Sequence, residues 1–266
     1  IVRQGRIDHS DSLGATARFG DGDVQWLTAG KGIVHCEMFP LRQTDAPNPA
    51  ELFQIWLNLP AKNKMADPHF TMLWNEQIQS LQLSDAPGRA STVRVVAGNF
   101  ATPGGSARGL PPPPSSWASQ SDADVAIWTV HMAAGARLTL PPAAHSATRR
   151  QLYFFRGTSL DIGGHSVKVQ TVTEVRAQDA LELMNGDTAC ELLVLQGRPI
   201  GEPVAQYGPF VMNTQAEVAQ AFADYRRTEF GGWPWPATDP VHPRERSRFA
   251  RHADGHVEEA PVGTAS

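Results

Sequence analysis

The chain has 266 residues, of which 41% are hydrophobic and 19% charged, and its formal net charge at pH 7 is −4. This composition is typical of a soluble globular protein with one or two domains, and the excess of 27 acidic over 23 basic residues does not favour nucleic acid as a direct partner. No run of about 18 apolar residues is present, so we expect no membrane span, and two widely separated cysteines indicate a reducing, cytoplasmic environment.

The first hundred residues predict a β domain. Turns that contain glycine recur at Gly14, Gly22 and Gly30, and the stretches between them are short. Residues 51–59 alternate between the two faces of a strand, one of them strongly apolar, and residues 93–97 form another strand-like run. We therefore assign residues 1–100 to an N-terminal β domain.

A break in the pattern follows. Residues 101–124 contain two consecutive glycines and four consecutive prolines, which favour an extended, exposed loop between domains. Residues 125–230 return to β periodicity, with glycine-containing hairpin turns. This second domain ends in a helix predicted at residues 215–227, where Thr214 is the N-cap and Glu217 completes a capping box.

Residues 231–266 form a tail rich in proline and tryptophan. Its prolines exclude regular structure over the first part. Its arginines between positions 244 and 251 predict a solvated surface, because acidic residues and proline are interspersed with them. We expect the tail to be partly disordered, from His252 onward.

The most informative motif lies at residues 22–38, where a glycine-punctuated turn precedes His35 and Glu37. If residues 33–38 form a strand, these two side chains share one face and Cys36 lies on the other. An imidazole and a carboxylate that project together are half of a mixed nitrogen–oxygen site for a first-row transition metal. The spacing alone is weak evidence, because nine histidines and 27 acidic residues predict roughly one such pair by chance and the chain has four. A hydrogen-bonded histidine in a half-buried strand is the alternative.

Residues 22–37 resemble the signature of the pirin family of bicupin proteins, Gly-Asp-(x)-Gln-Trp-Met-Thr-Ala-Gly-(x)-Gly-Ile-(x)-His-(x)-Glu, with Leu27 in place of the methionine. Residues 54–62 and 207–214 are similar to two further segments of the family, so the resemblance runs in order from Ile1 to about Phe230. It implies an all-β fold of two tandem cupin barrels of jelly-roll type, with one C-terminal helix.

The resemblance also implies a metal site built from three histidines and one glutamate. His35 and Glu37 match two of these ligands, whereas the other two come from a His-Pro-His-Arg-Gly-Phe-Glu segment that would precede Ile1. We therefore expect a chain truncated at its N-terminus, with an incomplete first barrel and with metal binding that is weak or absent. His9 is a further candidate ligand, but the turn before it leaves the direction of its side chain open.

For function, the resemblance implies an oxidoreductase of the quercetin 2,3-dioxygenase (quercetinase) type. Such an enzyme opens the ring of a flavonol-like aromatic substrate with O₂ and uses Fe(II) or another divalent first-row metal. Glu37 would then be both a metal ligand and the catalytic base that takes the proton of the substrate. We expect the apolar walls of the substrate pocket from Trp26, Phe53, Ile55 and Trp56, although core packing explains each of them equally well.

Two other interpretations stay open, so the sequence does not decide whether the protein is an enzyme. The family also includes iron-dependent regulatory proteins that bind transcription factors, which makes a non-catalytic protein with a redox-sensitive metal switch an alternative. A metal-free, inactive fragment is the other, because an incomplete barrel exposes unpaired strand edges. In each case we expect a monomer.

Overall fold

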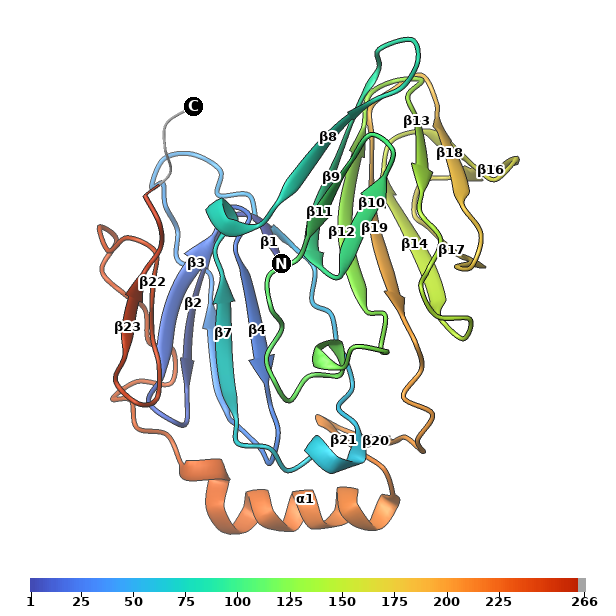
Figure 1. The fold of residues 1–266 in the computed structure, drawn as a ribbon. Coiled ribbons are helices and arrows are strands. Elements are labelled where there is room, and N and C mark those ends of the chain that lie inside the picture. The colour runs from blue at the N-terminus through green and yellow to red at the C-terminus, as the bar shows by residue number, and fades with distance from the viewer. Residues whose placement is uncertain (263–266) are drawn as a thin grey trace. The chain divides into compact units, whose positions relative to one another are not determined.

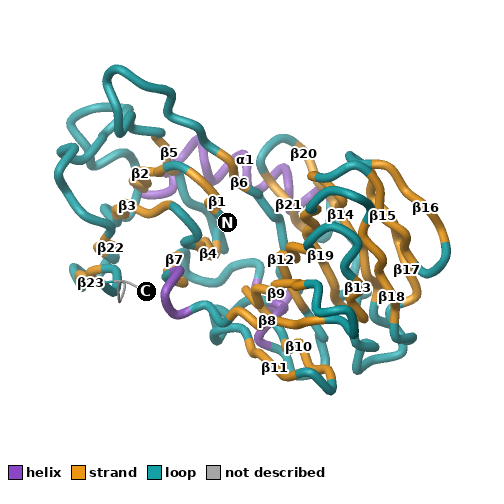
Figure 2. The backbone as a smooth tube through the Cα atoms, turned by 90° about the horizontal axis from the view of Figure 1, so that it is seen from above, coloured by secondary structure: helices purple, strands orange, loops and turns teal. Residues whose placement is uncertain are grey.

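The structure, a computed structural model, describes residues 1–262. Strands dominate these residues, and α1 (Gln215–Thr228) is the sole α-helix among them (Figures 1 and 2). The chain forms two compact units: the first contains residues 1–77, 113–116 and those from 201 onward, and the second contains residues 78–112 and 117–200. The predicted all-β class with one C-terminal helix is confirmed, although the sheets formed by residues 1–262 do not close into barrels. None of the described helices has the length and apolar character needed to cross a membrane.

The first unit is organised around an antiparallel five-stranded sheet. Its strands, in spatial order, are β23 (Val257–Glu259), β22 (Phe249–Arg251), β3 (Thr16–Gly20), β2 (Arg6–Asp11) and β5 (His35–Met38). Three two-stranded ribbons accompany it: β1 (Val2–Gln4) with β6 (Glu51–Leu52), β4 (Val24–Thr28) with β7 (His69–Leu73), and β20 (Ala205–Tyr207) with β21 (Phe210–Met212). The 3₁₀ helices of this unit are η1 (Ala61–Asn63), η2 (Asn75–Gln77) and η4 (Glu229–Gly231). Ile7, Phe19 and Phe70 belong to its buried core, and α1 runs below the lower ends of its strands (Figure 1).

The second unit contains two larger antiparallel sheets and a hairpin. The six-stranded sheet has the order β17 (Thr171–Arg176), β14 (Arg149–Arg156), β19 (Cys190–Gly197), β12 (Ala126–Met132), β9 (Ala90–Ala97) and β8 (Ser80–Ser84). The four-stranded sheet has the order β13 (Arg137–Leu140), β18 (Leu181–Asn185), β15 (Ser159–Ile162) and β16 (His165–Lys168). The hairpin pairs β10 (Asn99–Thr102) with β11 (Gly105–Arg108), and η3 (Trp117–Ser119) follows it. Alternate residues of the strands, such as Trp128, Leu152 and Leu192, face one continuous apolar core.

The helix α1 starts where its capping residues predict. Thr214 Oγ1 accepts the N–H of Glu217 at 3.2 Å, and Glu217 Oε2 accepts the N–H of Thr214 at 2.7 Å. This reciprocal pair satisfies two N–H groups that would otherwise lack partners at the start of the helix. The predicted capping box is therefore confirmed, and the helix ends one residue later than expected.

The segment predicted to be an exposed loop, residues 101–124, is partly regular. It contains β11 and the end of β10, which turn tightly at Gly104 and Gly105, the latter with a φ of 143° that glycine tolerates best. Phe100 and Ala107 face each other across this hairpin and are buried in the core of the second unit. Trp117 is also buried, and its indole N–H donates to the carbonyl oxygen of Arg198 at 2.7 Å. Burial of these apolar residues thus outweighs the preference of the glycines and prolines for an exposed, extended loop.

Strands β8 and β9, which precede residue 100, pair within the second unit. Strand β9 lies alongside β12 from Ser91 to Ala97, and Val93 and Val95 are fully buried there. The second unit therefore begins at residue 78, before the boundary that local composition suggested. Pairing between strands far apart in sequence decides this point, and composition contains no information about it.

The expectation of disorder from His252 onward is not met by the described part of the tail. Strands β22 and β23 form a hairpin that turns at Asp254 and Gly255, and β22 pairs with β3 (Figure 2). The arginines expected on a solvated surface also make specific bonds: Arg248 donates to Asp23 at 2.7 Å and to Glu76 at 2.5 Å. These long-range contacts give the tail partners that its proline-rich sequence does not reveal. The last four positions of the predicted disordered tail, 263–266, lie outside the described residues.

Candidate metal centre

The register between β2 and β5 brings four polar side chains onto one face of the sheet. His9 lies opposite Glu37, and Asp11 lies opposite His35. Directly opposed residues of an antiparallel pair share a face, and so do residues two apart on one strand. Cys36 lies between the two members of the His-x-Glu pair and therefore belongs to the other face.

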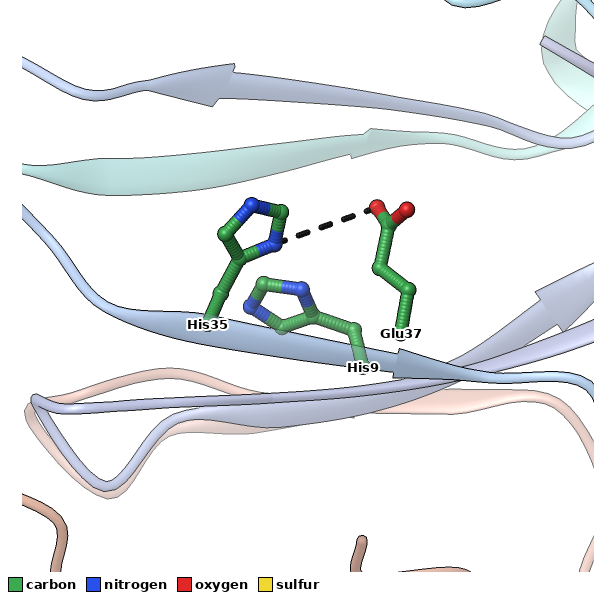
Figure 3. A group of neighbouring side chains, drawn as sticks. All are labelled: His9, His35 and Glu37. Atoms are coloured by element: carbon green, nitrogen blue, oxygen red, sulfur yellow. Dashed lines mark ion pairs between the residues drawn. The ribbon is translucent and has the colours of Figure 1, made fainter. Parts of the chain in front are cut away.

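Three of these side chains converge closely enough to hold a metal ion. One donor atom from each of His9, His35 and Glu37 lies within 4.8 Å of the others. His35 Nδ1 is 4.0 Å from Glu37 Oε1, and the rings of His9 and His35 have centroids 5.5 Å apart. Figure 3 shows the three side chains rising from the same side of their strands toward one another. Two imidazoles and a carboxylate form a mixed donor set suited to divalent first-row metals.

Asp11 orients the imidazole of His9. Its Oδ2 lies 3.2 Å from His9 Nε2, and its Oδ1 accepts the backbone N–H groups of Leu13 at 2.9 Å and Ala15 at 3.1 Å. Because a carboxylate only accepts hydrogen bonds, this contact assigns the proton of the neutral ring to Nε2 and leaves the lone pair on Nδ1. The same carboxylate also closes the turn between β2 and β3, where Gly14 has a φ of 78°.

The Nδ1 atom of His9 has no hydrogen-bond partner although it is buried. His9 is 0% exposed, so bulk water cannot donate a hydrogen bond to this lone pair. A histidine that donates one N–H to a carboxylate and presents its other nitrogen free is the usual arrangement of a metal ligand. The residues present therefore fit a bound cation.

Burial lowers the pKa of His35, and the nearby His9 lowers it further, while Glu37 and Asp11 act in the opposite direction. The neutral form that results is the one that binds metals. The side chains of His35 and Glu37 are 34% and 33% exposed, whereas those of His9 and Asp11 are 0% and 1% exposed. The centre is thus closed behind His9 and open in front of His35, as expected for a site that admits a substrate.

The tail lies close to the closed side of the centre. The ring of Phe70 on β7 lies edge-on to that of His9, with centroids 5.3 Å apart, and the centroids of the Phe70 and His252 rings are 4.9 Å apart. Trp235 donates its indole N–H to the carbonyl oxygen of Asp11 at 2.8 Å. Residues more than two hundred positions from β2 therefore shield the buried half of the site.

The four residues predicted to wall a substrate pocket belong to the first unit. Trp26 and Leu27 are successive residues of β4, so their side chains point to opposite faces, and it is Leu27 that faces Phe70 and the core. Phe53 and Ile55 are half-buried, and Trp56 is 64% exposed. Among the described residues, none of these four lines the groove that reaches His35.

Sequence reasoning left the direction of His9 open and counted Asp11 among the His-x-acid pairs without giving it a role. The signal was present as another of the four His-x-acid pairs, at positions 9 and 11, which also places two side chains on one strand face. What could not be deduced was that β2 and β5 are neighbours with His9 opposite Glu37. Register between strands depends on tertiary packing.

Comparisons with known proteins agree with this architecture. The family model "Pirin" matches residues 1–57, and the model "Pirin C-terminal cupin domain" matches residues 127–231. A Pseudomonas aeruginosa protein named "Putative quercetin 2,3-dioxygenase" is 35% identical over 86% of this chain and 74% of its own length. Pirin-1 of Arabidopsis thaliana is 31% identical over 86% of this chain and 72% of its own length. The crystal structure of quercetin 2,3-dioxygenase from Acinetobacter baumannii superposes with a TM-score of 0.73 and 28% identity, covering 87% of this chain and 75% of that one.

Proposed function

The chain belongs to the pirin family of cupin proteins, and from this premise we propose that it is a metal-dependent oxidoreductase of the quercetin 2,3-dioxygenase type. In this proposal His9, His35 and Glu37 hold one divalent first-row metal, such as Fe(II). The substrate is a flavonol-like aromatic molecule with an acidic hydroxyl group. Relatives named as quercetin 2,3-dioxygenases support the reaction class.

The observation that carries the proposal is the convergence of three donor atoms within 4.8 Å, one of them on a buried histidine whose Nδ1 has no other partner. A divalent ion held there would lower the pKa of a hydroxyl oxygen bound to it. The donor set of two neutral imidazoles and one carboxylate leaves such an ion with a net positive charge, which favours an anionic ligand.

In this proposal the surrounding residues have separate roles. Asp11 holds the ring of His9 in one tautomer and one orientation. Glu37, whose side chain is one-third exposed, accepts the proton of the substrate hydroxyl. Phe70 and the tail residue Trp235 exclude water from the buried side, so that a proton taken by Glu37 leaves only through the open face.

The proposal is tested by measuring metal content and oxygen uptake on the same preparations. Two ligands alone would bind a metal weakly or not at all, but His9 adds a third donor. We therefore expect about one iron-group ion per chain and oxygen uptake that depends on quercetin. His35→Ala should lose both, whereas His131→Ala, an exposed histidine on β12 of the second unit, should keep both. Oxygen uptake that survives His35→Ala would rule out this mechanism, and bound metal without any uptake would favour the non-catalytic regulatory alternative.

A further inference from the structure

A second pocket, of about 240 Å³, lies within the first unit. Its lining includes Arg6, at the start of β2, and most of the loop that follows β5, residues 39–50. Arg6 precedes His9 by three positions, so its side chain points to the opposite face of the strand. The pocket is therefore separate from the candidate metal centre, although strands β2 and β5 lead to both.

Hydrogen bonds and close packing fix the shape of this loop. Asn48 Oδ1 accepts the backbone N–H groups of Arg42 at 2.7 Å and of Gln43 at 2.9 Å. Gly5, which has a φ of 96°, lets the loop approach the chain between β1 and β2, because a Cβ at this position would lie 3.0 Å from the carbonyl oxygen of Pro49. The pocket is therefore preformed.

Positive charge dominates the polar part of the pocket. Its lining residues, all of which the structure describes, include two guanidinium groups, those of Arg6 and Arg42, and one carboxylate, that of Asp21. Arg42 Nη1 lies 2.5 Å from Asp21 Oδ2, so this carboxylate is paired with Arg42. Burial lowers the pKa of Arg6, and the guanidinium groups of Arg18 and Arg42 lower it further, more strongly than two nearby carboxylates raise it. An anion beside Arg6 is therefore favoured.

Both guanidinium groups have N–H donors left for a ligand, since each carries five. Arg6 Nη1 donates to the carbonyl oxygen of Arg244 at 3.2 Å. Arg42 Nη2 donates to the carbonyl oxygen of Gly5 at 3.0 Å, and its Nε has no hydrogen-bond partner among the described residues. Planar guanidinium groups bind carboxylates through pairs of such N–H groups.

We propose that this pocket binds a small organic monoanion, a carboxylate attached to a short apolar body. One negative charge balances the single excess positive charge of the lining residues. The carboxylate accepts hydrogen bonds from Arg6 and Arg42. The site is independent of the function proposed for the metal centre, because it uses none of the metal ligands.

The walls of the pocket define the rest of the ligand. Phe39, Leu41 and three prolines, Pro40, Pro47 and Pro49, form its apolar part. Phe39 is 48% exposed and Leu41 is 62% exposed, so an apolar body that covers them removes apolar surface from water. The volume of about 240 Å³ is just below the range of pockets for drug-sized ligands, so the pocket suits a single ring or a short chain.

The test is a calorimetric titration of the full chain with benzoate at low ionic strength. Benzamide has nearly the same shape without the charge, and inorganic phosphate has charge without the apolar body. Benzoate should bind at least about tenfold more tightly than either probe, because only benzoate uses both parts of the pocket. Equal affinity for benzamide would overturn the anionic assignment, equal affinity for phosphate would overturn the apolar one, and no binding at about 20 mM benzoate would overturn both.

Variants of the two arginines test the site itself. Arg6→Gln and Arg42→Gln should each weaken benzoate binding about tenfold, because each removes a charged donor. Arg226→Gln is the matched control, since Arg226 is an exposed residue of α1 outside the pocket and the change in net charge is the same. Wild-type affinity in both pocket variants would overturn the proposal. So would an affinity that is lost only in His35→Ala, because benzoate would then bind at the metal.

A variant that strengthens binding separates the proposal from a folding defect. Asp21→Asn removes the carboxylate of the pocket, and asparagine tolerates the φ of 46° at this position. Benzoate should then bind about threefold more tightly, because one repulsive charge is gone. Damage to the fold weakens binding and does not strengthen it. Unchanged or weaker binding of benzoate by Asp21→Asn would count against the assignment of this pocket to anions.

Discussion

Replacing Arg18 with methionine should destabilise the first unit more than any surface substitution. Arg18 is 1% exposed, and its Nε and Nη2 donate to the two carboxylate oxygens of Asp8 at 2.7 and 2.8 Å. The same guanidinium donates to backbone carbonyl oxygens of the tail: to His242 at 2.9 Å, to Pro243 at 2.5 Å and to Arg246 at 2.9 Å. One side chain of β3 therefore anchors the tail to the sheet.

The magnitude follows from what the substitution leaves behind. Asp8 is also 1% exposed, and without Arg18 it keeps the hydrogen bond from the backbone N–H of His242 at 2.8 Å. Removing one member of a buried ion pair costs about 3–5 kcal/mol, because the other charge stays buried and uncompensated. At about 1.4 kcal/mol per factor of ten, the unfolded fraction of this unit should rise by roughly two to more than three orders of magnitude.

The assay is urea unfolding followed by tryptophan fluorescence, combined with limited proteolysis of the tail. We expect the midpoint of the first unit to fall and cleavage between residues 235 and 250 to accelerate. Arg251→Met is the matched control, since Arg251 is exposed on β22, which pairs with β3, and donates a long hydrogen bond of 3.4 Å to the carbonyl oxygen of Gly14. Its effect should stay within about 0.5 kcal/mol. A loss below about 1 kcal/mol for Arg18→Met would refute the reasoning from buried charge.

Three other substitutions test separate parts of the structure. Asp11→Asn should lower metal affinity about 10- to 100-fold in a chelator competition, whereas Asp161→Asn, which alters a turn of the second unit, should not. Burial lowers the pKa of His242 in the folded protein below its ordinary 6.5. Between that lowered pKa and 6.5 the unfolded chain binds more protons than the folded one, so the free energy of unfolding should decrease as pH falls through 6.5. His242→Gln should flatten this pH dependence in urea titrations at pH 5 and 7.5. Leu192→Ala, at a position that is 0% exposed, should destabilise the second unit by about 2–5 kcal/mol, and Leu41→Ala, at a position 62% exposed, by less than about 0.5 kcal/mol.

Features that depend on neighbouring residues could be predicted from the sequence. The N-terminus of α1 was found at Thr214 because a capping box needs only residues three positions apart. The shared face of His35 and Glu37 followed from the two-residue period of a strand, and β5 indeed spans these positions. The all-β class followed from the same period, repeated along the chain.

Features that depend on distant residues could not be predicted from the sequence. Residues 101–108 read as a loop until β10 and β11 are seen to bury Phe100 and Ala107. The tail read as unstructured because its arginines and prolines show no period, and its order comes from Arg18, more than two hundred positions away. In both cases contacts made in the folded state outweigh the local preference of the segment.

The sequence by itself determined two of the donors of the candidate metal centre and the strand that presents them, because side-chain direction within a strand is a local property. Only the tertiary structure decided that His9 joins the candidate centre, that Asp11 bonds to its ring, and that the segment after α1 lines a groove with His35. The physical reason is that strand register and tail docking are set by hydrogen bonds and burial between segments far apart in the chain, and these are determined together as the chain folds.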